Sequence, residues 1–469
     1  MATELARTNP WWRDSAGWTA LDIDLRPVAA TGLGYRSECL DNLAPGALHI
    51  LRGPRRVGKT VAVKQAVQSL LAAGTPAHAI VRVAADGWSA NDLRTVVQNA
   101  SLPPVAPGQT RWWFLDEITA VTGDWATQVK WLRDNDPDFA AATVVLTGSS
   151  AGKLTSAAGV LAGRRRGRGV DADRTLLPMG FASFARLLEP RLPDVERVEL
   201  AHLRSGATAA KYHALLPWIA DLVRLWEVYL RYGGFPASVA AAAAGRPEPQ
   251  EFIEDLFDVI FRDAFAASQL STSVTSALFE RVMESMASPL NMNNIARDLT
   301  LSSETVRRHV SYLRDAYLVW PCPHWDEPRW TAKERAQDKL YAVDPLIARV
   351  PHLRNASRHD IDPSVLTEMQ LGMAIQRAAH LSGARWSDDE FLFHTRTATR
   401  KEIDFISEKL AGVAIEGKYT DTGRWTGEAA TVDASRWDGI LATRGVLDTK
   451  SRTGAWAVPA SFLAYLIDG

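Results

Sequence analysis

Cysteine is scarce in this chain of 469 residues, which contains only Cys39 and Cys322. Two cysteines so far apart in sequence supply neither a disulfide framework nor a cysteine-based zinc site, so a bound metal would need carboxylates. An excess of charge is missing too, because 53 lysines and arginines face 54 aspartates and glutamates. A global attraction to nucleic acid is therefore excluded, and such binding is confined to local patches.

Long apolar runs are also missing. None approaches the roughly 20 residues that a bilayer-spanning helix needs. The N-terminal segment MATELARTNPWWRDS lacks the basic stretch and apolar core of a secretory signal. We therefore expect a cytoplasmic protein without a membrane segment. The composition, 46 % apolar and 23 % charged, is that of an ordinary globular protein. The length predicts about three domains.

Short apolar runs alternate with helical stretches in the first part of the chain. Residues 47–52, 79–84, 111–116 and 143–148 have the composition of buried strands, and residues 60–73 have that of a helix. Strands that alternate with helices are typical of a parallel sheet covered by helices. The sequence therefore predicts an α/β fold for this part.

A glycine-containing motif follows the first of these strands and precedes the helix. The motif GPRRVGKT fits the pattern G-x-x-x-x-G-K-[ST] of a phosphate-binding loop, or P-loop. Its members are Gly53, Pro54, Arg55, Arg56, Val57, Gly58, Lys59 and Thr60. Such a loop turns backbone N–H groups toward phosphates, while Lys59 neutralises β and γ oxygens and Thr60 supplies a ligand to Mg²⁺. The alternative is an ordinary strand-to-helix turn that contains a lysine by chance.

A carboxylate pair ends another strand of the predicted sheet. The run WWFL is followed by Asp116 and Glu117, and the carboxyl ends of parallel strands form the ligand-binding edge of a sheet. Asp116 would hold Mg²⁺ through water, and Glu117 would orient and polarise the attacking water. Ser149 follows the next strand, where a polar side chain can contact the γ-phosphate. A simple helix cap is the alternative for that serine.

Phosphoryl transfer also gains from an arginine that neutralises the developing charge. An expected exposed loop at residues 161–169 supplies the candidates Arg164, Arg165, Arg166 and Arg168. Each could act within the chain or on a neighbouring copy, which would make the protein a homo-oligomer. Solvated surface, or contact with a phosphate backbone, is the alternative for each of them.

Taken in order, these motifs and several later ones resemble a single family. GPRRVGKT, FLDEI, LTGSS, LAGR and LPMGFASF are followed by YLRYGGFP, KLYAVDPLI, KEIDFI, AIEGKY and LATRG. The series is similar to AAA-type ATPases of bacteria and archaea whose C-terminal domain was long catalogued as of unknown function and is related to restriction-type nucleases. The resemblance implies an ATPase that uses ATP and Mg²⁺, a helical and winged-helix region, and a restriction-endonuclease-like α/β domain. The boundaries we expect are 1–190, 191–325 and 326–469.

Residues 292–319 have the pattern of a short helix, a turn and a second helix. Serines at 302 and 303 can cap the second helix. Its apolar face is expected to carry Val306, Val310 and Leu313. The residues expected largely off that face, and so available to DNA, are Arg307, Arg308, His309 and Arg314. A role in packing between domains is the alternative.

Two strand-like segments near the C-terminus, 401–406 and 413–418, predict a hairpin. The period of two puts Glu416 and Lys418 on one face, where Asp404 of the neighbouring strand can join them. This set resembles the PD-(D/E)xK nuclease core, which implies that Asp404 and Glu416 bind Mg²⁺ and that Lys418 orients water or stabilises the transition state. A surface salt bridge between exposed strands is the alternative.

Glu368, on an expected helix, matches the position of an additional acid in that core. Ile403 precedes Asp404 where the pattern has proline, and no clear Gln-x-x-x-Tyr motif follows. Three functions stay open. The first is an ATP-dependent enzyme whose nucleotide state controls binding or cleavage of DNA or RNA. The second is a regulatory ATPase switch whose nuclease-like domain binds partners without cleaving, and the third is a nucleotide-binding scaffold that does not hydrolyse ATP.

Overall fold

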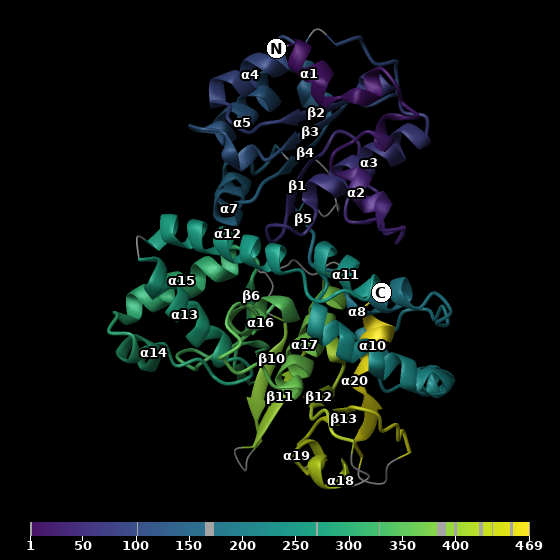
Figure 1. Ribbon diagram of the computed structural model, residues 1–469, viewed down its shortest axis with the longest axis vertical. Helices are drawn as coiled ribbons and strands as arrows, with labels where there is room; N and C mark the ends of the chain where they lie inside the picture. Colours follow the sequence, from purple (N-terminus) through teal and green to yellow (C-terminus); the bar gives the residue numbers. More distant parts are fainter. Residues whose placement is uncertain are drawn as a thin grey trace. The chain divides into compact units, whose positions relative to one another are not determined.

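The chain divides into two compact units, which are residues 1–177 (unit 1) and 178–469 (unit 2). Figure 1 labels the helices and strands of both units. The computed structural model describes residues 2–100, 102–164, 173–268, 271–327, 329–381, 391–397, 401–421, 425–433, 435–450 and 454–468. The expected boundary at 325 falls inside unit 2, and the division into three domains stays a prediction.

Unit 1 is a parallel sheet with helices on both faces. Its strands are β1 (Leu48–Arg52), β2 (Ile80–Ala84), β3 (Trp112–Asp116), β4 (Thr143–Thr147) and β5 (Asp173–Thr175). Its helices are α1 (Ala2–Thr8), α2 (Leu25–Ala30), α3 (Lys59–Ala72), α4 (Ala90–Gln98), α5 (Trp125–Asn135), α6 (Pro137–Ala141) and α7 (Ala151–Val160). The expected α/β fold of this part is confirmed, and β5 is a strand that the sequence pattern did not indicate.

The strands of unit 1 follow the order β2-β3-β4-β1-β5, and every neighbouring pair is parallel. All residues of β1 and β4 are buried, as expected of strands that are covered on both faces. Because the strands run in one direction, the carboxyl ends of β1, β3 and β4 lie side by side. Ligands of open α/β sheets bind at that edge.

Helices α4 and α5 cover one face of this sheet, and α2 and α3 lie on the other (Figure 1). The core on the first face includes Leu93, Val96, Val129, Leu132, Trp113, Leu115, Val144 and Leu146. On the second face, α3 buries Ala62, Val63, Ala66 and Val67. Close packing on both sides holds the strand ends in fixed positions, which any site built on them requires.

The N-terminal segment protects the edge strand β2. The side-chain amide of Asn9 pairs with the backbone of Arg82, donating to its carbonyl at 2.8 Å and accepting from its N–H at 2.6 Å. The indole N–H groups of Trp11 and Trp12 both donate to the carbonyl of Ile80, at 3.0 and 2.9 Å. These side chains therefore occupy backbone groups through which an exposed edge would pair with another strand.

Unit 2 combines many helices with a second sheet. Its helices are α8 (Phe181–Leu188), α9 (Gly206–Ala214), α10 (Ile219–Tyr232), α11 (Pro236–Ala243), α12 (Gln250–Ser268), α13 (Thr272–Glu284), α14 (Met292–Asp298), α15 (Ser303–Asp315), α16 (Pro345–Arg354), α17 (Pro363–Leu381), α18 (Trp425–Glu428), α19 (Ala430–Asp433) and α20 (Ala460–Ile467). Its strands are β6 (Val319–Cys322), β7 (Trp325–Asp326), β8 (Thr331–Ala332), β9 (Lys339–Ala342), β10 (Phe393–Arg396), β11 (Glu402–Ile406), β12 (Val413–Gly417), β13 (Asp438–Thr443) and β14 (Trp456–Pro459).

The larger sheet of unit 2 has the order β10-β11-β12-β13-β14. Its first three strands are antiparallel, and its last three are parallel. β11 and β12 form the expected hairpin, with Phe405 opposite Ile415 and Ile406 opposite Ala414. The restriction-endonuclease-like assignment of this part stays a prediction.

Helices α14 and α15 form the expected pair of short helices. Ser302 caps α15 by accepting a hydrogen bond from the N–H of Thr305 at 3.0 Å. The expectation for His309 is wrong, because its side chain is buried beside Val310 and burial lowers the pKa of its imidazole to about 4. The exposed residues of α15 include Arg307, Arg308 and Arg314. The winged-helix assignment stays a prediction.

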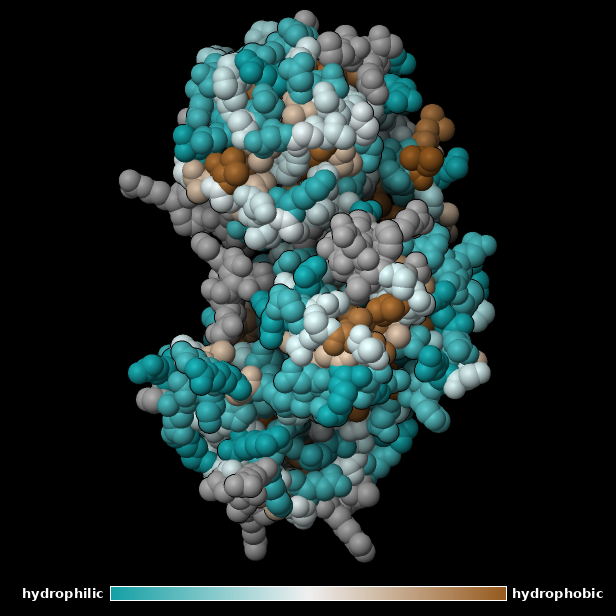
Figure 2. Space-filling view, turned by 90° about the vertical axis from the view of Figure 1, so that its left-hand side faces the viewer, coloured by the Kyte–Doolittle hydropathy of each residue, from teal (hydrophilic) through white to brown (hydrophobic). Residues whose placement is uncertain are grey.

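In the part of the chain that the structure describes, no helix is both long enough and apolar enough to cross a membrane. Hydrophilic residues predominate on the face drawn in Figure 2, where apolar residues form small separate groups. The most exposed large apolar side chains among the described residues are Leu21 and Ile23, at 84 % and 77 %. Apart from the grey atoms, this face therefore shows no broad apolar area.

Candidate functional site

The P-loop connects β1 to α3, and two glycines shape it. Gly53 has a φ of +143° and Gly58 a φ of +98°, both in the region that favours glycine. A Cβ atom on Gly53 would lie 2.0 Å from the carbonyl oxygen of Leu176, so a larger residue would displace the backbone that follows β5. Helix α3 begins at Lys59 without a side-chain cap. An uncapped helix N-terminus preceded by a glycine turn suits an anion.

Lys59 lies inside this loop and is only 7 % exposed. Its Nζ donates to the carbonyl oxygens of Gly53 and Pro54, at 3.0 and 2.8 Å. Burial lowers the pKa of the Lys59 ammonium to about 8, although the nearby Glu117 carboxylate partly opposes this effect. A bound triphosphate would supply negative charge and raise that pKa again.

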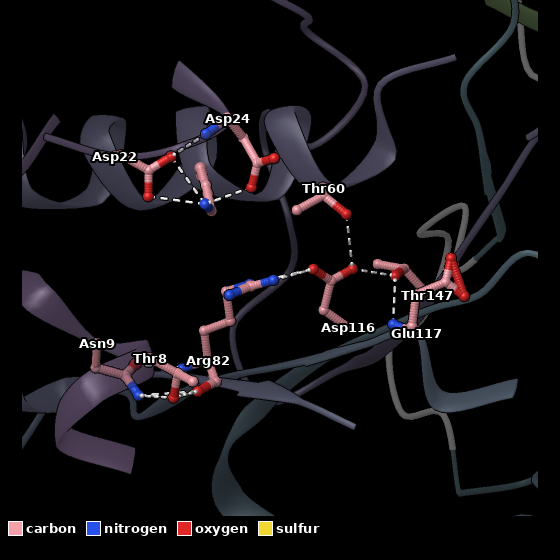
Figure 3. A network of polar contacts seen from close by, with 10 residues as sticks. Thr8, Asn9, Asp22, Asp24, Thr60, Arg82, Asp116, Glu117 and Thr147 are labelled. Atoms are coloured by element: carbon pink, nitrogen blue, oxygen red, sulfur yellow. Dashed lines mark hydrogen bonds and ion pairs between the residues drawn. The ribbon is translucent and has the colours of Figure 1, made fainter. Parts of the chain in front are cut away.

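Asp116, at the end of β3, is the centre of a polar network (Figure 3). Its Oδ1 accepts from the Thr147 hydroxyl at 2.6 Å and lies 3.5 Å from the Thr60 hydroxyl. Its Oδ2 accepts from Nη2 and Nε of Arg82, at 2.6 and 3.1 Å. The carboxylate is therefore held by side chains from β2, α3 and β4, and it faces the first turn of the P-loop helix.

Glu117 lies next to this network and is held by the end of β4. Its backbone is left-handed, with a φ of +53°, and its N–H donates to the Thr147 hydroxyl at 3.2 Å. Its Oε2 accepts from the backbone N–H of Ser149 at 3.0 Å. Ser149 therefore contacts the site through its backbone, by orienting Glu117. A role of its hydroxyl at a γ-phosphate stays a prediction.

The oxygen atoms of Thr60 and Asp116 fit a Mg²⁺ ion that arrives with a nucleotide. In ATP sites Mg²⁺ keeps several waters and takes one or two protein oxygens, the rest of its shell coming from phosphates. A hydroxyl and a carboxylate oxygen 3.5 Å apart satisfy that need. Among the residues described here, no group of three or more histidine, cysteine, aspartate or glutamate side chains is arranged to hold a metal without such a partner.

Of the four arginine candidates, the structure describes Arg164. Arg164 pairs with Asp134, its Nε lying 3.1 Å from Oδ1, and both side chains are exposed. Arg165, Arg166 and Arg168 lie outside the described residues. An arginine that completes the site, from this chain or from a neighbouring copy, therefore stays a prediction.

Two residues of this site were missed in the sequence. Arg82 holds Oδ2 of Asp116, and Thr147 contacts both Asp116 and the N–H of Glu117. Arg82 did carry a signal, because a charged residue inside the apolar run IVRVA must find a partner if the strand is buried. Thr147 carried none, because a threonine at a strand end has an ordinary composition for that position.

A second polar cluster lies in unit 2 and joins the residues predicted for a nuclease core. The N–H of Gly417 donates to Oδ2 of Asp404 at 3.0 Å, and the N–H of Asp404 donates to Oε2 of Glu416 at 3.3 Å. Lys418 Nζ lies 2.7 Å from Oε1 of Glu416. Burial and the Asp404 carboxylate raise the pKa of Glu416 to about 7. The hairpin therefore brings Asp404, Glu416 and Lys418 together, as its strand periodicity predicted.

Glu368 reaches the same cluster from α17, and two further residues meet it there. The hydroxyl of Tyr341 donates to Oε1 of Glu368 at 2.5 Å, and Lys339 Nζ lies 2.9 Å from the same oxygen. Burial and then the Asp404 carboxylate raise the pKa of Glu368 to about 8. Sequence reasoning missed Lys339 and Tyr341. The signal available was their alternation in KLYA, which puts both side chains on one face of β9.

Comparison with protein families bears on the first of these sites. Residues 46–185 match a family model described as an AAA domain. This segment, most of which lies in unit 1, is therefore similar to AAA domains. The matched segment runs from just before β1 to α8 and includes the whole P-loop, Asp116 and Glu117. The resemblance stated from the motifs is confirmed for this AAA domain, and its winged-helix and nuclease-like parts stay predictions.

The remaining comparisons concern unit 2 and solved structures. Residues 223–358 match a family model described as a domain of unknown function (DUF8612). No curated protein matches the chain. A Walker-type ATPase of Pyrococcus abyssi aligns with 13 % identity and a TM-score of 0.37, covering 68 % of this chain and 93 % of its own. The ORC2 protein of Aeropyrum pernix aligns with 12 % identity and a TM-score of 0.34, covering 71 % and 94 %. Likenesses at this level carry no information about activity.

Proposed function

We propose that the AAA domain of unit 1 binds and hydrolyses ATP with Mg²⁺. The observation that supports this proposal is the convergence of Lys59, Thr60 and Asp116 at the carboxyl edge of the sheet, where Thr60 Oγ1 lies 3.5 Å from Asp116 Oδ1. The P-loop backbone from Gly53 to Gly58 would surround the phosphates. Lys59 would exchange its two carbonyl partners for β and γ oxygens.

The remaining residues have roles that follow from their contacts. Thr60 and Asp116 would hold Mg²⁺, which supplies neutralising charge to the phosphate oxygens when it is bound. Glu117 would orient and polarise the attacking water. Among the described residues, the N–H of Ser149 anchors its carboxylate at Oε2, and Oε1 is the atom that would face a water. Arg82 holds the Asp116 carboxylate in place through two hydrogen bonds to its Oδ2.

Calorimetry of ATP binding at pH values below and above about 8 tests the Lys59 assignment. The empty site loses the Lys59 proton as the pH rises through that value, whereas the complex keeps it. Binding above this pH therefore takes up close to one proton, and the Kd should rise by up to about tenfold per pH unit. In Lys59→Ala the Kd for ATP at neutral pH should rise by at least about tenfold, because the variant loses a charge-assisted hydrogen bond to the phosphates.

The control is Lys130→Ala, a lysine on α5 that lies outside the P-loop. It should bind ATP as the wild type does, with the same proton uptake. Equal affinity of wild type and Lys59→Ala at every pH would contradict the proposal that this lysine holds the triphosphate.

We propose further that nucleotide state in unit 1 controls engagement of nucleic acid, DNA or RNA, by unit 2. The feature that supports the engagement of nucleic acid is the set of exposed arginines on α15, Arg307, Arg308 and Arg314, which lie off the buried stripe that contains Val306 and Leu313. Arg307 is paired with Glu304 at 2.5 Å. Such a face suits a phosphate backbone, and it provides the local patch that a chain of nearly neutral charge needs.

A variant with Arg308→Ala and Arg314→Ala together should bind DNA more weakly. Each arginine that contacts a phosphate contributes close to one unit to the slope of log K against log salt, so we expect the slope to fall by about 2. Titration of a labelled duplex at several salt concentrations measures this slope. Arg224→Ala, which removes an exposed arginine from α10, is the matched control and should leave the slope unchanged. An unchanged slope in the double variant would show that these arginines of α15 do not contact the DNA.

A further inference from the structure

Lys339 lies at the centre of the carboxylate cluster of unit 2. It is the first residue of β9, and its side chain is fully buried, with an exposed fraction of 0 %. Its Nζ lies 2.9 Å from Oε1 of Glu368, 2.6 Å from Oε1 of Glu402 and 2.9 Å from Oδ1 of Asp404. One ammonium group therefore contacts three carboxylates, which come from α17 and β11.

The remaining oxygens of Asp404 and Glu416 also have donors. Oδ2 of Asp404 accepts from the N–H of Gly417, and Oε2 of Glu416 accepts from the N–H of Asp404. Oε1 of Glu416 is paired with the Lys418 ammonium at 2.7 Å. Both oxygens of Asp404 and both of Glu416, the two residues predicted to bind Mg²⁺, are thus engaged by N–H donors of the protein itself.

A divalent cation would need the same oxygens at the same place. Mg²⁺ takes its oxygen ligands at about 2.0–2.1 Å and Ca²⁺ at about 2.3–2.6 Å. A cation that binds Oε1 of Glu368, Oε1 of Glu402 and Oδ1 of Asp404 would therefore have to lie where Lys339 Nζ lies. An ammonium and a divalent cation a few ångströms apart repel each other strongly in a buried site. Burial alone would lower the pKa of Lys339, but Asp404, Glu368 and Glu402 raise it above its ordinary value. As arranged, the donor set does not fit a metal.

We propose that Lys339 is a resident counter-ion that takes the cation position of this cluster, so that unit 2 holds Glu368, Glu402 and Asp404 together without a divalent metal. The proposal concerns unit 2 alone and does not depend on ATP hydrolysis by unit 1. It favours the alternative in which unit 2 binds partners without metal-dependent cleavage. It also implies that loss of the ammonium opens a site for a divalent cation, because the carboxylates that surround it remain.

Binding of Mn²⁺ in the absence of nucleotide tests this proposal, with free Mn²⁺ measured by electron paramagnetic resonance. Wild type and Asp404→Asn should bind Mn²⁺ equally, because the cluster takes none. Lys339→Ala should gain one site with at least tenfold higher affinity than any in the wild type, and the double variant Lys339→Ala with Asp404→Asn should lose it. The control Lys401→Ala removes an exposed lysine next to β11 and should behave as the wild type.

Thermal unfolding provides a second measurement. Lys339→Ala leaves buried carboxylates without their counter-ion and should unfold at a lower temperature, and millimolar Mn²⁺ should restore part of the loss only in this variant. If Lys339→Ala does not fold, Mn²⁺ binding by wild type and Asp404→Asn still shows whether the cluster holds a metal. A wild-type Mn²⁺ site that Asp404→Asn abolishes would overturn the proposal, and so would a folded Lys339→Ala that gains no site.

Discussion

Replacing Glu117 with glutamine should lower kcat for ATP hydrolysis by about 10²- to 10⁴-fold while it changes ATP affinity only slightly. The amide has nearly the same shape and can still accept the hydrogen bond from the N–H of Ser149. It cannot accept a proton from water or polarise water as a carboxylate does. The loss should therefore fall on the chemical step, which steady-state rates and calorimetry with ATP separate.

The control for this variant is Glu38→Gln, which makes the same chemical change at an exposed position of unit 1. It should hydrolyse ATP at the wild-type rate. A wild type that binds ATP without turnover would contradict the proposed hydrolysis and support the scaffold alternative. Equal rates in wild type and Glu117→Gln would assign the activation of water to another residue.

The second large effect is expected in unit 2, where Asp468→Ala should destabilise the fold by about 3–5 kcal/mol. Asp468 is 4 % exposed and forms a two-contact ion pair with Arg377, which is 9 % exposed. Its Oδ2 also accepts from the N–H of Phe181 at 2.8 Å. The carboxylate thus joins α17 to the start of α8. Removing it leaves a buried guanidinium without its ion-pair partner, which costs far more than an exposed ion pair contributes.

Scanning calorimetry measures this effect as a fall in the Tm of unit 2, which we expect to be roughly 5–15 °C. The exposed pair between Arg281 and Glu284 gives the control, since Glu284→Ala should change the Tm little. A double variant, Arg377→Met with Asp468→Leu, should recover most of the lost stability because both charges are gone. Equal Tm values for Asp468→Ala and the wild type would show that water or another side chain compensates the arginine.

The strands and helices around the P-loop were predicted closely because their signals are local. Each of these signals lies within one short stretch of sequence. They are the four buried apolar runs, the helix that follows the glycine motif, and the acid at the end of a strand. The hairpin that joins Asp404 to Glu416 was also predicted from strand period alone. His309 shows where a local pattern misleads, since a polar residue next to Val310 on the helix turned out to face inward.

The partners of the buried charges were not predicted. Arg82 and Asp116 are 34 residues apart, Lys339 and Asp404 are 65 apart, and Arg377 and Asp468 are 91 apart. No periodicity connects such positions. The sequence signal was weak in each case. A charged residue in an apolar stretch indicates that it has a partner, but it does not indicate which residue that partner is.

By itself the sequence determined the parallel α/β sheet of unit 1, the P-loop and the hairpin, because backbone conformation and burial pattern follow from neighbouring residues. Only the tertiary structure decided which charges meet. In the tertiary structure Arg82 contacts Asp116. The Lys339 ammonium lies among the carboxylates of unit 2, at the place where a metal ion could otherwise bind. The physical reason is that the energy of a buried charge depends on the few ångströms around it, and those surroundings are assembled from distant parts of the chain.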